Sequence, residues 1–251
     1  YREIVLCGVD VGSYGENLDE AGQHYNLAYL LREVCRLEGD FRLRISSLDP
    51  SYLDSELIDV LASEEKICPH FQLSLQSGNA LILKRMKRRY TAELMFERVE
   101  ELSARIPHAV FGADIMAGFP TESEQAFKDS LVMIERLQIA FPHVFSYSDR
   151  PGVPAARIPR QIPHDIRKRR TRALIEAGEK IRQKMFDSLV EQAYEAAVLI
   201  EKQDSTQPQW STGRSAEYLP IVIKEGAFSS GDMINVQITG TDGSRLIARP
   251  L

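Results

Sequence analysis

Short apolar runs of β-forming residues alternate with longer amphipathic segments up to about residue 190, and no other feature constrains the fold as much. The runs expected to form strands cover residues 3–7, 42–46, 71–75, 110–116 and 141–145. The segments expected to form helices cover residues 26–37, 51–63, 80–85, 92–105 and 123–137. This alternation is typical of βα units around a mostly parallel sheet. The sequence therefore predicts an α/β fold for this part of the chain.

Two of these helices have recognisable start signals. Asp49 precedes Pro50, and proline suits the first helical position because it has no N–H to leave unpaired. Thr121 and Glu124 have the spacing of a capping box directly after Gly118-Phe119-Pro120. Both helices are then expected to begin just past the carboxyl end of a strand, which is the rim where α/β proteins bind ligands.

The chain changes character in two places after the last predicted strand. Prolines and a glycine interrupt regular structure over residues 150–163, and a long helix is predicted over residues 164–190 that packs back on the sheet. Beyond residue 195, short runs at 197–200, 219–223, 233–239 and 245–248 are separated by glycines. That spacing predicts a small antiparallel β-barrel. We expect one domain over residues 1–190 and a second over residues 191–251.

The composition favours a soluble globular chain, since 43% of its residues are hydrophobic and 27% are charged. No apolar run reaches the roughly 18 residues of a membrane span, and the first residues have no signal-peptide pattern. A cytoplasmic location without membrane contact is therefore expected. Cys7, Cys35 and Cys68 are too far apart for a disulfide framework or a metal site, so buried apolar roles and no metal ligands are expected.

Positive charge is concentrated in residues 84–90 and 167–172, although the net charge is −5. A nucleic-acid site needs a basic face, not a basic total, and phosphate contacts release counterions. The side chains predicted to contact RNA are Lys84, Arg85, Lys87, Arg88, Arg89, Arg169 and Arg170. The alternative is that each run is a solvated helix face, which is the commoner meaning of a single charged run.

Small polar residues and glycines follow four of the predicted strands. They include Asp10, Arg44, Ser46, Gln76, Ser77, Gly118 and Glu122. Together they are suited to a small polar cofactor, because a carboxylate binds an amine, a guanidinium binds a carboxylate, and hydroxyls and amides bind a ribose. The alternative is four unrelated caps and turns, which parallel α/β proteins also need.

Several motifs carry a resemblance to a known family. They are Glu3-Ile4-Val5-Leu6, Arg44-Ile45-Ser46-Ser47-Leu48-Asp49-Pro50, Leu75-Gln76-Ser77-Gly78-Asn79, Leu83-Lys84-Arg85-Met86, Gly118-Phe119-Pro120-Thr121-Glu122 and Phe145-Ser146-Tyr147-Ser148-Asp149-Arg150-Pro151-Gly152. Their order and spacing resemble the methylthiotransferase branch of the radical-SAM superfamily over the whole chain. Cys68-Pro69-His70 and Arg88-Arg89-Tyr90-Thr91 resemble the group that acts on N6-threonylcarbamoyladenosine in tRNA.

The resemblance implies a partial (βα) radical-SAM TIM-like barrel followed by a TRAM-like or OB-like RNA-binding barrel. It implies S-adenosylmethionine and [4Fe–4S] clusters as cofactors, tRNA as partner, and addition of a methylthio group to C2 of a modified adenosine in the anticodon loop. The family holds its catalytic cluster on a CxxxCxxC motif, and none is present here. The sequence is therefore expected to begin after that motif, and these residues alone are expected to be inactive.

The resemblance also assigns roles to residues at the strand ends. Asp10 is expected to meet the methionyl amine of S-adenosylmethionine. Arg44 and Ser46 are expected to face its carboxylate or ribose, and Gln76 and Ser77 are expected to lie beside it. These assignments depend on position in the family's motifs.

The motif that begins at Gly118 is assigned to the adenine of the cofactor, together with Glu122. Thr121 departs from the family, which usually has glycine there, and this puts close approach of the backbone in question. Three other functions remain open: a tRNA-binding module without activity, a ribosomal-protein methylthiotransferase, and an unrelated α/β-barrel enzyme for a phosphorylated metabolite.

Overall fold

The computed structural model describes residues 1–18, 25–150, 152–204, 207 and 209–251. Its first five strands are parallel to their neighbours. The strands are β1 (Glu3–Leu6), β2 (Arg42–Ile45), β3 (His70–Gln76), β4 (Val110–Ala117) and β5 (Ile139–Ser146). β1 pairs with β2, and β3, β4 and β5 form a second sheet in that order. Parallel bridges from Leu43 to Ile67 and from Leu48 to Leu73 connect the two sheets. The predicted parallel α/β fold is confirmed.

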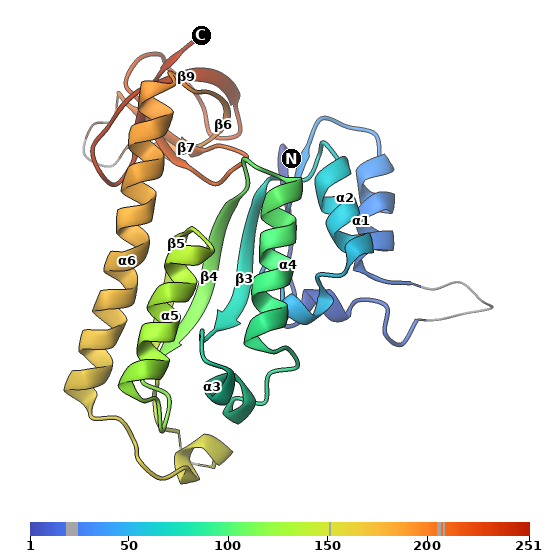
Figure 1. Cartoon of the computed structure of the whole chain (residues 1–251). Coiled ribbons are helices and arrows are strands. Elements are labelled where there is room, and N and C mark those ends of the chain that lie inside the picture. Colours follow the sequence, from blue (N-terminus) through green and yellow to red (C-terminus); the bar gives the residue numbers. More distant parts are fainter. Residues whose placement is uncertain (19–24, 151, 205–206, 208) are drawn as a thin grey trace.

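Helices cover one face of this array of strands. They are α1 (Leu27–Arg36), α2 (Ser55–Ser63), α4 (Ala92–Arg105) and α5 (Glu124–Arg136), whereas α3 (Ala80–Arg85) lies beyond the carboxyl end of β3 (Figure 1). Alternate side chains of a strand point to opposite faces, so Phe71, Leu73 and Leu75 of β3 enter the core shared with the helices. Gln72 and Ser74 therefore point to the other face.

Two helices begin later than their start signals predicted. Ser123 caps α5 by accepting a hydrogen bond from the Ala126 N–H, whereas Thr121 has a φ of 70° and donates its N–H to the Arg160 carbonyl. Thr121 is thus part of a left-handed turn, and the predicted capping box is wrong. Asp49 does cap a short 3₁₀ helix, Pro50–Tyr52, but α2 begins after a second cap at Asp54.

The carboxyl-terminal strands form a closed barrel, as predicted. They are β6 (Glu195–Gln203), β7 (Ser211–Arg214), β8 (Pro220–Ile223), β9 (Met233–Thr241) and β10 (Leu246–Pro250), in the order β10-β8-β7-β6-β9. Four neighbouring pairs are antiparallel, but β8 and β10 are parallel, which differs from the expected all-antiparallel barrel. β7 was not predicted because its sequence, Ser-Thr-Gly-Arg, has no apolar alternation.

Helix α6 (His164–Glu191) runs from the carboxyl ends of the strands to the barrel (Figure 1). Leu174, near its start, packs in the core beneath the sheet, and Phe186, near its end, packs in the barrel core. The predicted helix and its packing on the sheet are confirmed. The connector before it contains a short 3₁₀ helix, Pro154–Arg157, and its Pro151 lies outside the described residues. Among the described residues, no helix is long and apolar enough to cross a membrane.

Candidate functional site

Asp10 lies just past the carboxyl end of β1, where it begins a short 3₁₀ helix, Val11–Ser13. Its carboxylate accepts hydrogen bonds from the Tyr52 hydroxyl and the Arg89 guanidinium, both at 3.2 Å. Arg89 also donates to the Tyr52 hydroxyl. Burial, a hydrogen bond to Glu16 and the charge of Asp10 raise the pKa of Tyr52. Asp10 therefore lies at the rim as predicted, held by a residue of the first basic run.

Ser46 follows β2 at the same rim. Its hydroxyl oxygen is buried and has no hydrogen-bond partner among the described residues. A buried hydroxyl without a partner is costly, so it marks a place where a polar ligand atom is expected. In contrast, Ser77 is fully buried after β3, and its hydroxyl accepts the Asn79 N–H at 3.2 Å. Gln76 ends β3 with a φ of 58°, which gives the chain its sharp turn.

The turn after β4 is held together from within. Gly118 has a φ of 75° and donates its N–H to the Glu122 carboxylate at 3.0 Å. Arg170 of α6 donates to the same carboxylate at 2.7 Å, and both side chains are buried. Burial raises the pKa of Glu122, while Arg170 acts in the opposite direction.

Glu122 was assigned, with Gly118, to the turn that receives the adenine of the cofactor. Its carboxylate bonds Gly118 and Arg170 in the structure, and the assignment stays a prediction. The same contacts correct another prediction. Arg170 was assigned to RNA, but it is buried and bonds Glu122 and Glu124. A charged run on a helix places every third or fourth residue inward, so a run cannot contribute all its charges to one surface.

Arg44 also lies elsewhere than predicted. Its guanidinium is buried, donates to the Glu3 carboxylate at 2.9 Å, and reaches the carbonyl oxygens of Ser215 and Ala216 in the barrel. The assignment of Arg44 to the cofactor is therefore wrong, because the Arg44 side chain points from β2 toward the barrel. Arg44 and Arg42 together hold the pKa of Glu3 below its usual value, against the effect of burial.

The first basic run extends from the end of α3 and is mostly exposed. Lys84, Arg85, Lys87 and Arg89 are exposed, and Arg88 is half-buried beside Asp49. In the second run, Arg169 is exposed. α3 and the start of α6 lie at the same end of the molecule, opposite the barrel (Figure 1). The two runs therefore flank the rim.

A cavity of about 500 Å³ opens between α3, the start of α5 and the connector that precedes α6. Arg85 and Arg160 line it together with Asn79 and Ser123, and Arg85 donates to the Thr121 hydroxyl. Two guanidinium groups beside amide and hydroxyl groups are suited to a phosphate. Arg160 was not among the predicted residues, because it stands alone in the proline-rich connector.

A polar cluster on the open face of the sheet was also missed. Asp114 of β4 accepts hydrogen bonds from the Gln72 amide at 2.9 Å and the Ser47 hydroxyl at 3.2 Å, and His143 of β5 lies 3.4 Å away. We call Ser47, Gln72, Asp114 and His143 the Asp114 cluster. The signal was present, since a carboxylate that alternates with core residues of a strand must point away from the core.

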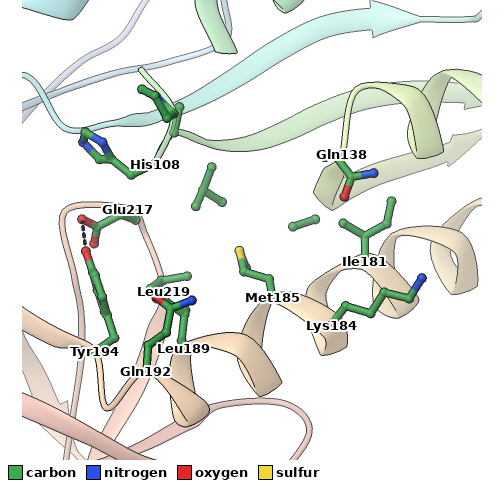
Figure 2. Close-up of a pocket in the computed structure, with 14 residues that line it drawn as sticks. His108, Gln138, Ile181, Lys184, Met185, Leu189, Gln192, Tyr194, Glu217 and Leu219 are labelled. Carbon is green, nitrogen blue, oxygen red and sulfur yellow. Dashed lines mark hydrogen bonds between the residues drawn. The ribbon is translucent and has the colours of Figure 1, made fainter. Parts of the chain in front are cut away.

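A second cavity, of about 520 Å³, lies at the amino ends of β4 and β5, between the sheet, α6 and the barrel (Figure 2). Ile181, Met185 and Leu219 supply apolar walls. At one side Tyr194 donates to Glu217 at 3.1 Å, and burial with that carboxylate raises the pKa of Tyr194 to about 12. This cavity is at the opposite end of the strands from the rim.

No group of three or more His, Cys, Asp or Glu side chains that fits a metal ion occurs in the part of the chain that the structure describes. Cys35 and Cys68 are buried as expected, and burial raises the pKa of Cys68 to about 11. Cys7 is exposed, which corrects its predicted buried role.

Comparisons with known proteins place this geometry in a wider context. The model of the radical SAM superfamily matches residues 2–134. The chain is 42% identical over 179 residues to the threonylcarbamoyladenosine tRNA methylthiotransferase MtaB of Rickettsia prowazekii, which covers 71% of the chain and 42% of that protein. It is 40% identical over 187 residues to the protein of the same name from Aquifex aeolicus, covering 74% and 44%.

A relative with a different printed substrate is also similar. The chain is 35% identical over 241 residues to the tRNA-2-methylthio-N(6)-dimethylallyladenosine synthase of Desulfitobacterium hafniense, which covers 94% of the chain and 52% of that protein. The chain thus spans about half the length of the curated relatives it matches.

Proposed function

The chain belongs to the radical SAM superfamily, and from that premise we propose that it acts in tRNA methylthiolation, adding a methylthio group to C2 of N6-threonylcarbamoyladenosine in an anticodon loop. The two relatives at 42% and 40% identity carry the name of that activity. The observation that carries the proposal is the rim, where Asp10 and the unpartnered Ser46 hydroxyl lie beside an exposed basic run.

Two residues of the rim fit S-adenosylmethionine. The Ser46 hydroxyl has no hydrogen-bond partner within the described ranges of the chain, and Asp10 is partly exposed with a charge suited to the methionyl amine. When bound, the cofactor supplies the radical that activates the C2–H bond. The chain's part is to bind it and to exclude water. Members of the superfamily use iron–sulfur clusters, and the described residues include no group of ligands that fits one.

The exposed basic side chains support tRNA as the partner. Lys84, Arg85 and Lys87 have no carboxylate within ion-pair distance among the described residues, so their charges are available to phosphates. The bases of an anticodon loop are unpaired and can be splayed out toward a protein. The barrel is the second candidate RNA surface, as in other five-stranded barrels of this kind.

Nucleoside analysis tests the proposed activity. The gene product containing these 251 residues is expressed in bacteria that lack their own enzyme for this modification, and digested tRNA is analysed by mass spectrometry. We expect 2-methylthio-N6-threonylcarbamoyladenosine to appear. If the dimethylallyl analogue appeared instead, the substrate would be the one named for the Desulfitobacterium relative. If a ribosomal protein were methylthiolated instead, the protein would be a ribosomal-protein methylthiotransferase.

A separate measurement addresses the 251 residues by themselves. We expect them to bind tRNA without modifying it, because the described residues present no cluster ligands. Gel-shift and nucleoside assays on the same preparation check both statements. If the whole gene product also bound tRNA without modifying it, the protein would be a non-enzymatic tRNA-binding module.

A further inference from the structure

A carboxylate with no lysine or arginine partner among the described residues lies on β4, the middle strand of its sheet. Asp114 is 19% exposed, and its only ion-pair partner among the described residues is the ring of His143, at 3.4 Å. Its other two contacts, from Gln72 and Ser47, are neutral donors. Each carboxylate oxygen accepts more than one hydrogen bond, so Asp114 keeps acceptor capacity directed toward solvent.

The orientation of this carboxylate is set by its neighbours. A Cβ atom added at Gly112 would lie 2.0 Å from the Gln72 side-chain oxygen, so the amide occupies the space that glycine leaves open beside β4. Gln72 and Gly112 are paired in register across the two strands. The amide lies beside Gly112, with its nitrogen donating to Asp114. An acceptor held in this way is preorganised for a ligand.

An aromatic surface lies next to this acceptor. Phe145 of β5 is 40% exposed, and its ring centre is 4.2 Å from that of His143, which is itself 68% exposed. His143 is paired in register with Asp114, so the rings and the carboxylate belong to adjacent strands on one face. Exposed rings beside a hydrogen-bond acceptor are the usual means by which proteins hold an unstacked base.

We propose that the Asp114 cluster and Phe145 form the recognition site for the target purine base, with Asp114 accepting the N–H on N6. This inference rests on the proposed function and deepens it. An adenine acylated on N6 keeps one N–H there, so the carboxylate has a donor in both the modified and the unmodified base. A metal ion is a poorer fit, because Asp114 and His143 are only two ligands.

The test uses two anticodon stem–loop RNAs that differ in one amine. One carries adenosine at the target position, and the other carries purine riboside, which lacks the exocyclic amine. Fluorescence anisotropy with this chain should show roughly tenfold weaker binding of the purine RNA, the effect of one hydrogen bond to a charged group. Asp114→Ala should bind both RNAs equally, because it removes the acceptor. Asp114→Asn keeps one neutral acceptor oxygen and should show a smaller difference than the unmutated chain, whereas the surface variant Asp59→Asn should retain the full difference.

The outcomes separate this inference from the function on which it rests. Tight binding of both RNAs with equal affinity by the unmutated chain would overturn the base assignment and leave the tRNA proposal standing. Failure of the unmutated chain to bind either RNA would contradict both. Phe145→Leu should weaken both RNAs by a similar factor, because stacking does not depend on the amine; an unchanged affinity would remove Phe145 from the site. The proposal can be tested even if a variant fails to fold, because the two RNAs are compared on the unmutated chain.

Discussion

The guanidinium of Arg170 lies 2.7 Å from the carboxylate of Glu122, and both groups are buried between α6 and the turn that follows β4. The same carboxylate accepts the Gly118 N–H, so one ion pair holds the rim turn to the long helix. A buried charge that loses its partner is strongly unfavourable. This pair is therefore a structural device at the edge of the candidate site.

Arg170→Met should lower the free energy of unfolding by about 3–5 kcal/mol, because Glu122 is left charged and buried. The neighbouring Arg169→Met replaces an exposed side chain and should change stability by less than about 0.5 kcal/mol. Urea denaturation of both variants measures the difference. Equal midpoints would mean that Glu122 is neutral or hydrated without Arg170.

Gly118→Ala should be more damaging than Gly231→Ala, although both glycines have a positive φ, of 75° and 96°. A Cβ atom at Gly231 meets nothing within 4 Å, so only backbone strain of about 1–2 kcal/mol is expected. A Cβ atom at Gly118 would lie 2.2 Å from the Cγ atom of Arg167, which adds a steric cost of about 1–3 kcal/mol. Thermal unfolding of the pair separates strain from crowding, and equal losses would show that Arg167 moves aside freely.

His70 should make stability depend on pH. Burial, together with the charges of Arg44 and Arg214, lowers the pKa of His70 from 6.5 to about 3, and Glu3 opposes this only in part. Between those values the unfolded chain binds a proton that the folded chain does not, so the free energy of unfolding falls as the pH falls. The expected loss between about pH 6.5 and pH 5 is roughly 1.5 kcal/mol.

His70→Phe should remove this pH dependence. Neither ring nitrogen of His70 has a hydrogen-bond partner among the described residues, and the ring packs on Tyr218, so phenylalanine keeps the contact. The exposed His108→Phe is the matched control and should retain the slope. Glu3, whose pKa is lowered, changes the stability only below about pH 4.5, which is outside the measured range. A slope that survives in His70→Phe would assign it to another group.

The double variant Arg85→Ala with Lys87→Ala should weaken tRNA binding and flatten its salt dependence. Each lost phosphate contact reduces the slope of log affinity against log salt by roughly 0.7–0.9. Arg36→Ala with Arg105→Ala removes two exposed charges at the other end of the strands and should leave the slope unchanged. An unaltered slope in the Arg85→Ala, Lys87→Ala variant would exclude the first basic run from the RNA surface.

Asp10→Ala should lower the affinity for S-adenosylmethionine while leaving the fold intact, since the carboxylate is partly exposed and pairs with the exposed Arg89. Asp40→Ala, at an exposed position away from the rim, is the control. Calorimetric titration of the gene product with the cofactor gives the comparison, and normal affinity of Asp10→Ala would remove that residue from the site.

The sequence predicted correctly most features that depend on local side-chain patterns. The alternation of strand and helix patterns predicted all five parallel strands and the helices between them, because side-chain periodicity reports which face of each element is buried. The start of α5 was predicted to within one residue, but its cap was assigned to Thr121, whereas Ser123 supplies it because Thr121 belongs to a left-handed turn.

The sequence by itself determined the parallel α/β architecture, the presence of a terminal barrel and the family resemblance. Tertiary structure alone decided which charged groups are free. Arg170 looks in sequence like its exposed neighbour Arg169, yet it is buried against Glu122, and Arg44 is buried against Glu3, far along the chain. Asp114 was assigned no role in sequence, yet it meets Gln72 and His143 on an open face. Burial and pairing depend on contacts between distant segments, and local patterns do not contain them.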